Sequence, residues 1–196
     1  MYLNHIDYNN THYKKELEEL YLSAFPDDER FPFWLIKRCA EENNVKLNAI
    51  LDGEQFIGME YIVNCDNAYY LMYFAIDEKL RNKNYGSKTL ADLKEKYETI
   101  FLSIEKPCDE ITKKRKNFYL KNGFFETNKY YEDTGVEYEI LCTNKEYMIT
   151  EENVMKRYTN MSESPLIRET IGKIFNTDKV VFLDNSKTLF PSNKSK

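Results

Sequence analysis

Histidine and closely spaced cysteine, the usual protein ligands of zinc, are scarce in this sequence. Its 196 residues include two histidines, His5 and His12, and four cysteines, none within metal-ligand spacing of another. A zinc site or a histidine-based catalytic triad therefore has little material, and no metal site is predicted. We expect reduced, mostly buried thiols of a cytoplasmic protein at Cys39, Cys65, Cys108 and Cys142.

An excess of positive charge and a long apolar run are also missing. The net charge is −5 and the pI is about 5.3, whereas a sequence-independent nucleic-acid binder needs a basic face to displace counterions. We interpret the short basic run 113–116 as a solvated helix face. No apolar stretch reaches the length of a membrane span, and the N-terminus lacks a basic-then-apolar signal segment. Neither a nucleic-acid partner nor a membrane is therefore expected. The net negative charge suits a cationic partner such as an amine.

The spacing of apolar residues predicts a mixed α/β fold. Helical periods occur at 11–24, 32–40, 85–97 and 111–122. Strand-like runs occur at 2–7, 47–51, 55–63, 67–76, 100–104, 124–131 and 136–142. This order predicts a sheet that is antiparallel at first and parallel around the crossover helix 85–97.

The last fifty residues differ from this pattern. Helices are expected to start near Thr150 and at Ser164-Pro165, and a short strand is expected at 180–183. Residues 191–196 are expected to be disordered. We interpret 1–145 as one domain and 146–196 as an appendage that docks on it or on a second subunit, which leaves a homodimer open.

The segment 81–87 follows a strand and begins a helix, which is where phosphates bind. The first N–H groups of a helix have no internal partners and attract anions. Gly86 has no Cβ, and Asn82 and Asn84 are of the type that best tolerates positive φ. Arg81 and Lys83 add positive charge. The alternative is an ordinary polar connection between a strand and a helix.

Two motifs in this order resemble the GNAT acetyltransferase superfamily. The segment 81–87 is similar to its pyrophosphate-binding motif, Arg/Gln-x-x-Gly-x-Gly/Ala, with Arg81 first and Gly86 last, although Asn84 replaces a usual Gly. The segment 115–124 is similar to the family's helix-to-strand segment ending in Phe-Tyr-x-x-x-Gly-Phe. The resemblance covers roughly residues 1–145.

The resemblance implies a GNAT-like sheet, with antiparallel N-terminal strands and a parallel central pair splayed for the cofactor, flanked by helices. It implies acetyl-CoA as cosubstrate, with Phe74 and Ile76 offering backbone groups to the pantetheine arm. The residues implied at the pyrophosphate are Arg81, Asn82, Lys83, Asn84, Tyr85, Gly86 and Ser87. Asn117 resembles a cofactor-contacting residue, the alternative being an exposed residue on a helix surface.

Tyr119 is the residue that the resemblance places near the sulfur, where it can stabilise the departing thiolate. Glu60 in a predicted strand and Glu105 at a strand end are candidate general bases, each with a solvated surface acid as its alternative. The acids of the first helix and the following loop either face a cationic acceptor or form a solvated face.

These features predict an N-acetyltransferase that moves the acetyl group of acetyl-CoA to a primary amine of a small molecule or peptide. The competing interpretation is a non-catalytic CoA-binding module that acts through protein contacts of its appendage. Tyr119 favours the enzyme, whereas Asn84 and the absence of a clear base leave room for the module.

Overall fold

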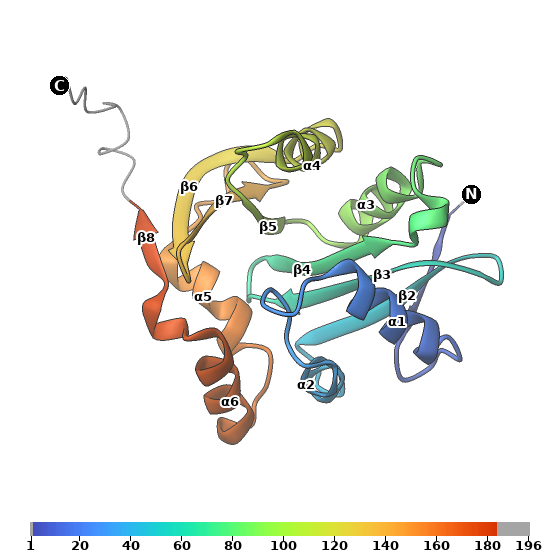
Figure 1. Cartoon of the computed structure of the whole chain (residues 1–196), viewed down its shortest axis with the longest axis horizontal. Coiled ribbons are helices and arrows are strands. Elements are labelled where there is room, and N and C mark those ends of the chain that lie inside the picture. The colour runs from blue at the N-terminus through green and yellow to red at the C-terminus, as the bar shows by residue number, and fades with distance from the viewer. Residues whose placement is uncertain (1, 184–196) are drawn as a thin grey trace.

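The computed structural model describes residues 2–183, which form one eight-stranded sheet with helices on both faces (Figure 1). The strand order is β1-β2-β3-β4-β5-β7-β6-β8, and only β4 and β5 pair in parallel within these residues. The predicted mixed sheet with a parallel central pair is thus confirmed. The strands are β1 Asn4–Asp7, β2 Val45–Asp52, β3 Gln55–Asn64, β4 Tyr69–Ile76, β5 Ile100–Glu105, β6 Phe125–Asp133, β7 Val136–Cys142 and β8 Val181–Leu183.

The helices divide between the two faces of the sheet. Their bounds are α1 Lys14–Ala24, α2 Phe33–Cys39, α3 Tyr85–Lys96, α4 Glu110–Lys121, α5 Glu151–Thr159 and α6 Pro165–Phe175. Buried residues of α1, α2, α5 and α6 belong to one apolar cluster, while α3 packs Leu90 and Leu93 into a second cluster that α4 borders. In Figure 1, α3 and α4 lie on the side of the sheet opposite α1 and α2. None of the helices in residues 2–183 has the length and apolar character needed to cross a membrane.

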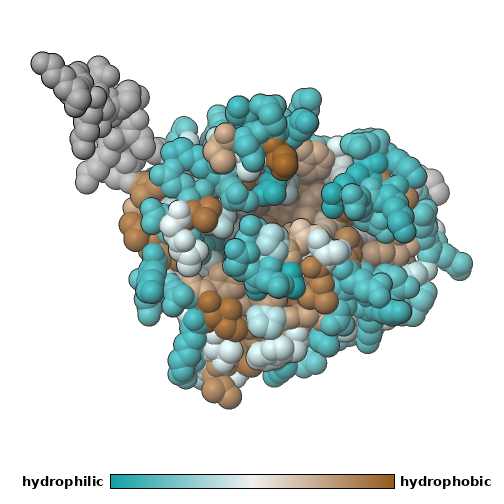
Figure 2. Space-filling view, viewed as in Figure 1, coloured by the Kyte–Doolittle hydropathy of each residue, from teal (hydrophilic) through white to brown (hydrophobic). Residues whose placement is uncertain are grey.

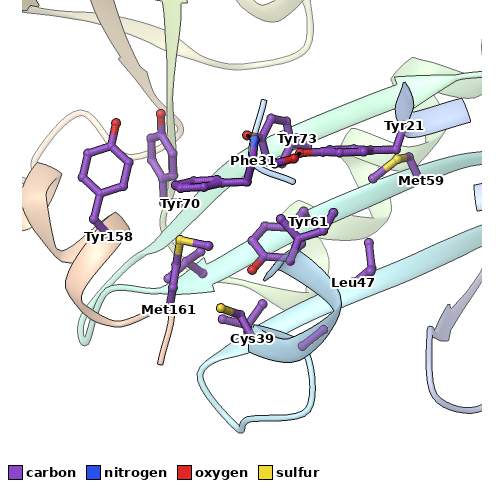
Figure 3. Packing of buried hydrophobic residues seen from close by; sticks show 14 of the residues in the cluster. Tyr21, Phe31, Cys39, Leu47, Met59, Tyr61, Tyr70, Tyr73, Tyr158 and Met161 are labelled. Carbon is purple, nitrogen blue, oxygen red and sulfur yellow. Dashed lines mark hydrogen bonds between the residues drawn. The ribbon is translucent and has the colours of Figure 1, made fainter. Parts of the chain in front are cut away.

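Aromatic side chains hold the loop between α1 and α2 against strand β4. The Tyr21 hydroxyl donates to the Phe31 carbonyl at 2.9 Å, and the Phe31 N–H donates to the Tyr73 hydroxyl at 3.1 Å. The Tyr21 and Tyr73 rings meet edge to face, 5.0 Å apart, among the buried residues drawn in Figure 3. Because buried hydroxyls need partners, these bonds fix where the loop runs.

Strands β4 and β5 separate soon after they meet. They pair only at Tyr69 with Ile100 and at Tyr70 with Phe101. The pairing of β3 with β4 shifts register after Tyr61, so that Met72 is an extra residue in β4. A bulge of this kind bends and twists its strand, and here it coincides with the point where β4 leaves β5.

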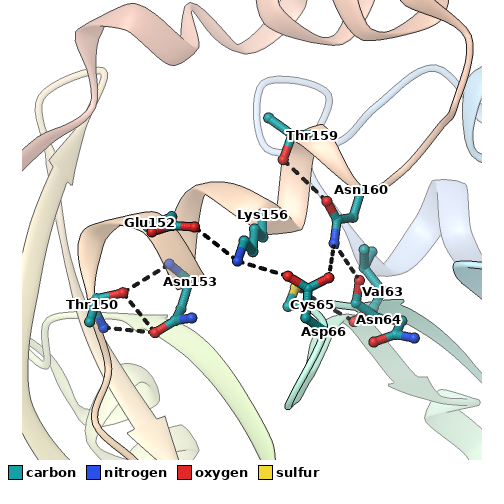
Figure 4. Close-up of polar contacts among 10 residues, drawn as sticks. All are labelled: Val63, Asn64, Cys65, Asp66, Thr150, Glu152, Asn153, Lys156, Thr159 and Asn160. Carbon is teal, nitrogen blue, oxygen red and sulfur yellow. Dashed lines mark hydrogen bonds and ion pairs between the residues drawn. The ribbon is translucent and has the colours of Figure 1, made fainter.

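The C-terminal segment joins the same sheet and packs against it through α5. Strand β8 pairs with β6, and helix α5 carries a capping box between Thr150 and Asn153. Figure 4 shows Lys156 of α5 paired with Asp66, in the turn between β3 and β4, at 2.7 Å and with Glu152 at 3.0 Å. Residues 191–196, for which disorder was predicted, lie outside the described residues.

Candidate active site

A cavity of about 1060 Å³ opens where β4 and β5 separate. It runs from the loop that precedes α3, along β4, β5 and α4, to side chains of β6, β7, α5 and α6. In Figure 2, apolar surface gathers near the centre of this face, bordered by hydrophilic residues. One continuous space therefore joins the predicted phosphate loop to the predicted catalytic region.

The loop at one end of the cavity has the backbone conformation that its asparagines predicted. Asn82 and Asn84 have φ values of 63° and 65°, and α3 begins at Tyr85. Asn84 makes no side-chain cap, and the first bond of the helix runs from Lys88 N to Asn84 O at 3.1 Å. The N–H groups of residues 85–87 thus have no acceptor within residues 2–183. They form the positive end of a twelve-residue helix, a suitable place for an anion.

Side-chain contacts hold this loop and set the approach of α3 to α4. The Arg81 Nε donates to the Ile76 carbonyl at 3.3 Å, and the Tyr85 hydroxyl donates to Asp52 at 2.9 Å. A Cβ at Gly86 would lie 3.0 Å from the Phe118 ring, closer than ordinary packing allows. Gly86 therefore permits the close approach of the two helices.

Most of the predicted cofactor residues line the cavity, and two do not. The residues at its wall are Phe74, Ile76, Arg81, Asn82, Asn84, Tyr85, Gly86 and Ser87. Lys83 is exposed beside the loop, and Asn117 is exposed on α4; neither lines the cavity. The helix α4 instead contributes Lys114, Arg115, Phe118 and Tyr119.

Tyr119 lies on the cavity wall with its hydroxyl unpaired within residues 2–183. Its ring is half-buried and packs edge to face against Phe118 and Phe124. Burial raises the pKa of Tyr119 to about 12. The hydroxyl is therefore neutral at physiological pH and able to donate a hydrogen bond.

The two candidate bases occupy different environments. Glu105 lines the cavity at the end of β5, where its carboxylate pairs with Arg115 at 3.0 Å. Glu60 is fully buried and does not line the cavity; it is hydrogen bonded to His5 Nδ1 at 3.0 Å and to Asn48 at 2.9 Å. Of the two, the structure brings only Glu105 together with Tyr119.

A further acid, Glu29, lines the same cavity from the loop between α1 and α2. Burial, followed by the nearby charge of Glu105, raises the pKa of the Glu29 carboxyl. An acid with a raised pKa is a stronger base when ionised. The predicted acceptor wall thus supplies one titratable group to the cavity. Within residues 2–183, no group of three or more His, Cys, Asp or Glu side chains could hold a metal ion.

The far end of the cavity was missed by sequence reasoning. It is formed by Tyr131, Asp133, Tyr138, Arg157, Tyr158 and Phe175. One signal was present: Arg157 lies on the same face of α5 as Val154 and Tyr158, and all three are buried. An arginine within an apolar stripe indicates a buried charge and hence a special role.

Comparison with known proteins identifies the fold. No protein-family model matches the chain, and no curated protein matches it by sequence search. A Bacteroides thetaiotaomicron protein assigned to the GNAT family of acetyltransferases is 25% identical, with a TM-score of 0.70 over 83% of this chain and 100% of that chain. A Bacillus subtilis acetyltransferase in complex with CoA is 18% identical, with a TM-score of 0.54 over 73% of this chain and 97% of that chain.

A third similar structure is the ribosomal-protein-S18-alanine N-acetyltransferase of Escherichia coli, 14% identical, with a TM-score of 0.55 over 76% and 96% of the two chains. The resemblance to the GNAT superfamily stated from the sequence is confirmed at the level of the fold. The chain has the fold of GNAT acetyltransferases.

Proposed function

We propose that the protein is an N-acetyltransferase that moves the acetyl group of acetyl-CoA to a primary amine of a small molecule or peptide. The observation that carries this proposal is the single cavity that joins the free N–H groups of α3 to the Tyr119 hydroxyl. Among the similar structures, one is a complex with CoA and another is an alanine N-acetyltransferase.

The residues at the loop end fit the pyrophosphate of the cofactor. The N–H groups of residues 85–87 and the Arg81 guanidinium would hold its charge. Beyond Tyr70, the edge of β4 that faces β5 has no strand partner within residues 2–183. An extended pantetheine arm can lie there like an added strand.

The chemistry requires a neutral amine and a stabilised thiolate. A lysine-like amine has a pKa near 10.4, so its deprotonation at pH 7 costs roughly 4–5 kcal/mol. Glu29 or Glu105 can accept that proton through a water, since both line the cavity. The amine nitrogen then attacks the thioester carbonyl, the carbon–sulfur bond breaks, and Tyr119 donates a hydrogen bond to the departing thiolate.

A thermal-shift titration combined with an amine panel tests this proposal. Acetyl-CoA and CoA should each stabilise the protein, and release of free CoA thiol should depend on the amine. Ser87→Asp, which adds a negative charge beside the free N–H groups, should abolish the shift. An absence of stabilisation by either compound would refute cofactor binding. Binding without turnover across the panel would favour the non-catalytic module.

A further inference from the structure

Arg157 of α5 is a buried cation on the cavity wall without a directly paired anion in the described part of the chain. Its side chain is 2% exposed, and it takes part in none of the ion pairs formed within residues 2–183. An arginine keeps its charge in proteins, so burial without a direct ion pair is costly. One counter-charge acts on Arg157 indirectly, that of Asp133, which is linked to it through the Tyr158 hydroxyl. Such an arrangement favours a further anion in direct contact with the guanidinium.

Neutral hydroxyls surround the guanidinium. Nη1 donates to the hydroxyls of Tyr70 at 3.2 Å, Ser103 at 3.3 Å and Tyr131 at 2.5 Å, and Nη2 donates to Tyr158 at 3.0 Å. Nη2 carries two N–H groups and meets one acceptor, and Nε has no partner within residues 2–183. We call these five residues, Arg157, Tyr70, Ser103, Tyr131 and Tyr158, the arginine–tyrosine cluster.

The cluster offers hydrogen-bond donors to the cavity. A tyrosine that accepts a bond from Arg157 must direct its own O–H elsewhere. The Tyr158 hydroxyl donates to Asp133 at 3.4 Å, and the Tyr131 hydroxyl is also hydrogen bonded to Ser103. The Tyr70 hydroxyl accepts from Arg157 and meets no acceptor of its own in the described part of the chain. All three tyrosines line the cavity. The Arg157 Nε, one N–H of Nη2 and the Tyr70 hydroxyl are thus unused donors beside a positive charge, which favours an anionic group. A carboxylate is the planar anion that arginine recognises best.

Carboxylates line the cavity as well, alongside the cations Lys114 and Arg115. Glu29 and Glu105 line it and lie near enough for the charge of one to raise the pKa of the other. Asp133 is nearly buried and its Oδ1 has no donor among residues 2–183. Glu29 and Glu105, together with a guanidinium that has unused N–H groups in the same cavity, match a ligand that carries both an ammonium and a carboxylate.

We propose that the acceptor is a small amino-carboxylate, such as an amino acid, and that its carboxylate binds the arginine–tyrosine cluster. This proposal rests on the proposed acetyltransferase function. The amine of the acceptor then lies toward Glu29, Glu105 and Tyr119. The segment that follows residue 145 thereby contributes directly to the acceptor site, through Arg157 and Tyr158.

Matched acceptors test the proposal. The panel pairs ω-amino acids of increasing length, from glycine to 5-aminopentanoate, with n-alkylamines of the same chain length, and includes lysine and phenylalanine beside cadaverine and phenethylamine. At least one amino-carboxylate should exceed its matched amine in kcat/KM by about 10- to 100-fold, as expected for a charge-assisted hydrogen-bonded pair. Equal or better use of the plain amines would overturn this inference and leave the proposed function standing.

Variants of two adjacent cations on α5 distinguish binding of the ligand carboxylate from an effect on helix packing. Arg157→Met should remove the preference through a raised KM for the amino-carboxylate, with the KM for acetyl-CoA unchanged. Lys156→Met removes a cation that contacts Asp66 and Glu152 and does not line the cavity, so it should keep the preference. Equal effects of both variants on the preference would show that Arg157 acts only in packing, which contradicts the proposal.

Tyr131→Phe keeps Arg157 in place and removes one hydroxyl, so it provides a test if Arg157→Met does not fold. It should reduce the preference for the carboxylate several-fold. Calorimetry of 4-aminobutyrate and butylamine with the CoA-saturated protein gives a readout independent of turnover. Failure of CoA itself to bind would refute the proposed function, whereas CoA binding without tighter binding of any amino-carboxylate would refute the inference alone.

Discussion

Replacing Tyr119 by Phe removes one hydroxyl from the cavity wall and leaves the ring in place. That ring packs against Phe118 and Phe124 at centroid distances of 5.3 and 5.4 Å. The hydroxyl has no partner within residues 2–183, so its loss leaves no buried group unpaired. The variant should fold like the parent, and any change in rate can then be attributed to the hydroxyl.

The pKa of Tyr119 determines how it can act. Burial raises it to about 12, whereas a thiol has a pKa near 8.5. Complete transfer of the tyrosine proton to the departing thiolate would therefore be uphill by about 5 kcal/mol, at about 1.4 kcal/mol for each pKa unit. Tyr119 should act as a hydrogen-bond donor to the thiolate, and loss of one such preorganised donor reduces kcat by about 10²- to 10³-fold.

Steady-state release of CoA thiol, measured against pH, tests this reasoning. Tyr119→Phe should lower kcat about 100-fold and leave the KM for acetyl-CoA nearly unchanged. Because the pKa lies near 12, the shape of the profile between about pH 7 and 10 should be the same in both proteins. Tyr97→Phe is the control, since burial also raises the Tyr97 pKa to about 12 outside the cavity. An unchanged kcat, or a limb near pH 9 that disappears in Tyr119→Phe, would refute the argument.

Three further predictions concern the loop and the sheet. Asn84 has a φ of 65°, so Asn84→Val should raise the KM for acetyl-CoA by about 5- to 30-fold through roughly 1–2 kcal/mol of strain, whereas Asn84→Gly should not. A Cβ at Gly58 would lie 2.5 Å from the Ala75 carbonyl oxygen, so Gly58→Ala should lower the free energy of unfolding by about 2 kcal/mol or more in urea titrations. Burial alone would lower the pKa of His5. The hydrogen bond and charge of Glu60, together with those of Asp92, outweigh burial, so the net effect is a raised pKa. A raised pKa stabilises the fold below about pH 6.5 and loses that effect as the pH rises through the folded-state value, so His5→Gln should be more destabilising at pH 5.5 than at pH 8.5.

The loop before α3 could be predicted because its chemistry is local. Asn82 and Asn84 have positive φ, and α3 begins at Tyr85 where the sequence placed it. These properties depend on which residue types tolerate a left-handed backbone and begin a helix, and both are readable from a few neighbouring residues. The separation of β4 from β5 was predicted from the family resemblance alone, because the sequence around Met72 gives no sign of the bulge found there.

The candidate base Glu60 shows where sequence reasoning ended. A period of two tells which residues share a face of a strand, and it does not tell which face borders a cavity. Glu60 and its partner His5 are 55 positions apart, so their hydrogen bond follows from the order of strands β1, β2 and β3. Glu29 likewise became a candidate base only in the structure, because its distance from Glu105 depends on how a loop packs across the sheet.

Two successive residues of helix α5 make different contacts. Lys156 contacts Asp66 in the turn between β3 and β4 at 2.7 Å, and Arg157 turns its guanidinium to the cavity, where it meets hydroxyls from β4, β5 and β6. The guanidinium thus hydrogen bonds to one residue of each of these three strands. A ligand carboxylate at this place would contact strands on both sides of the gap between β4 and β5. Binding of the acceptor would then tighten the gap proposed for the pantetheine arm, so acceptor and cofactor should each increase the affinity for the other by the same factor.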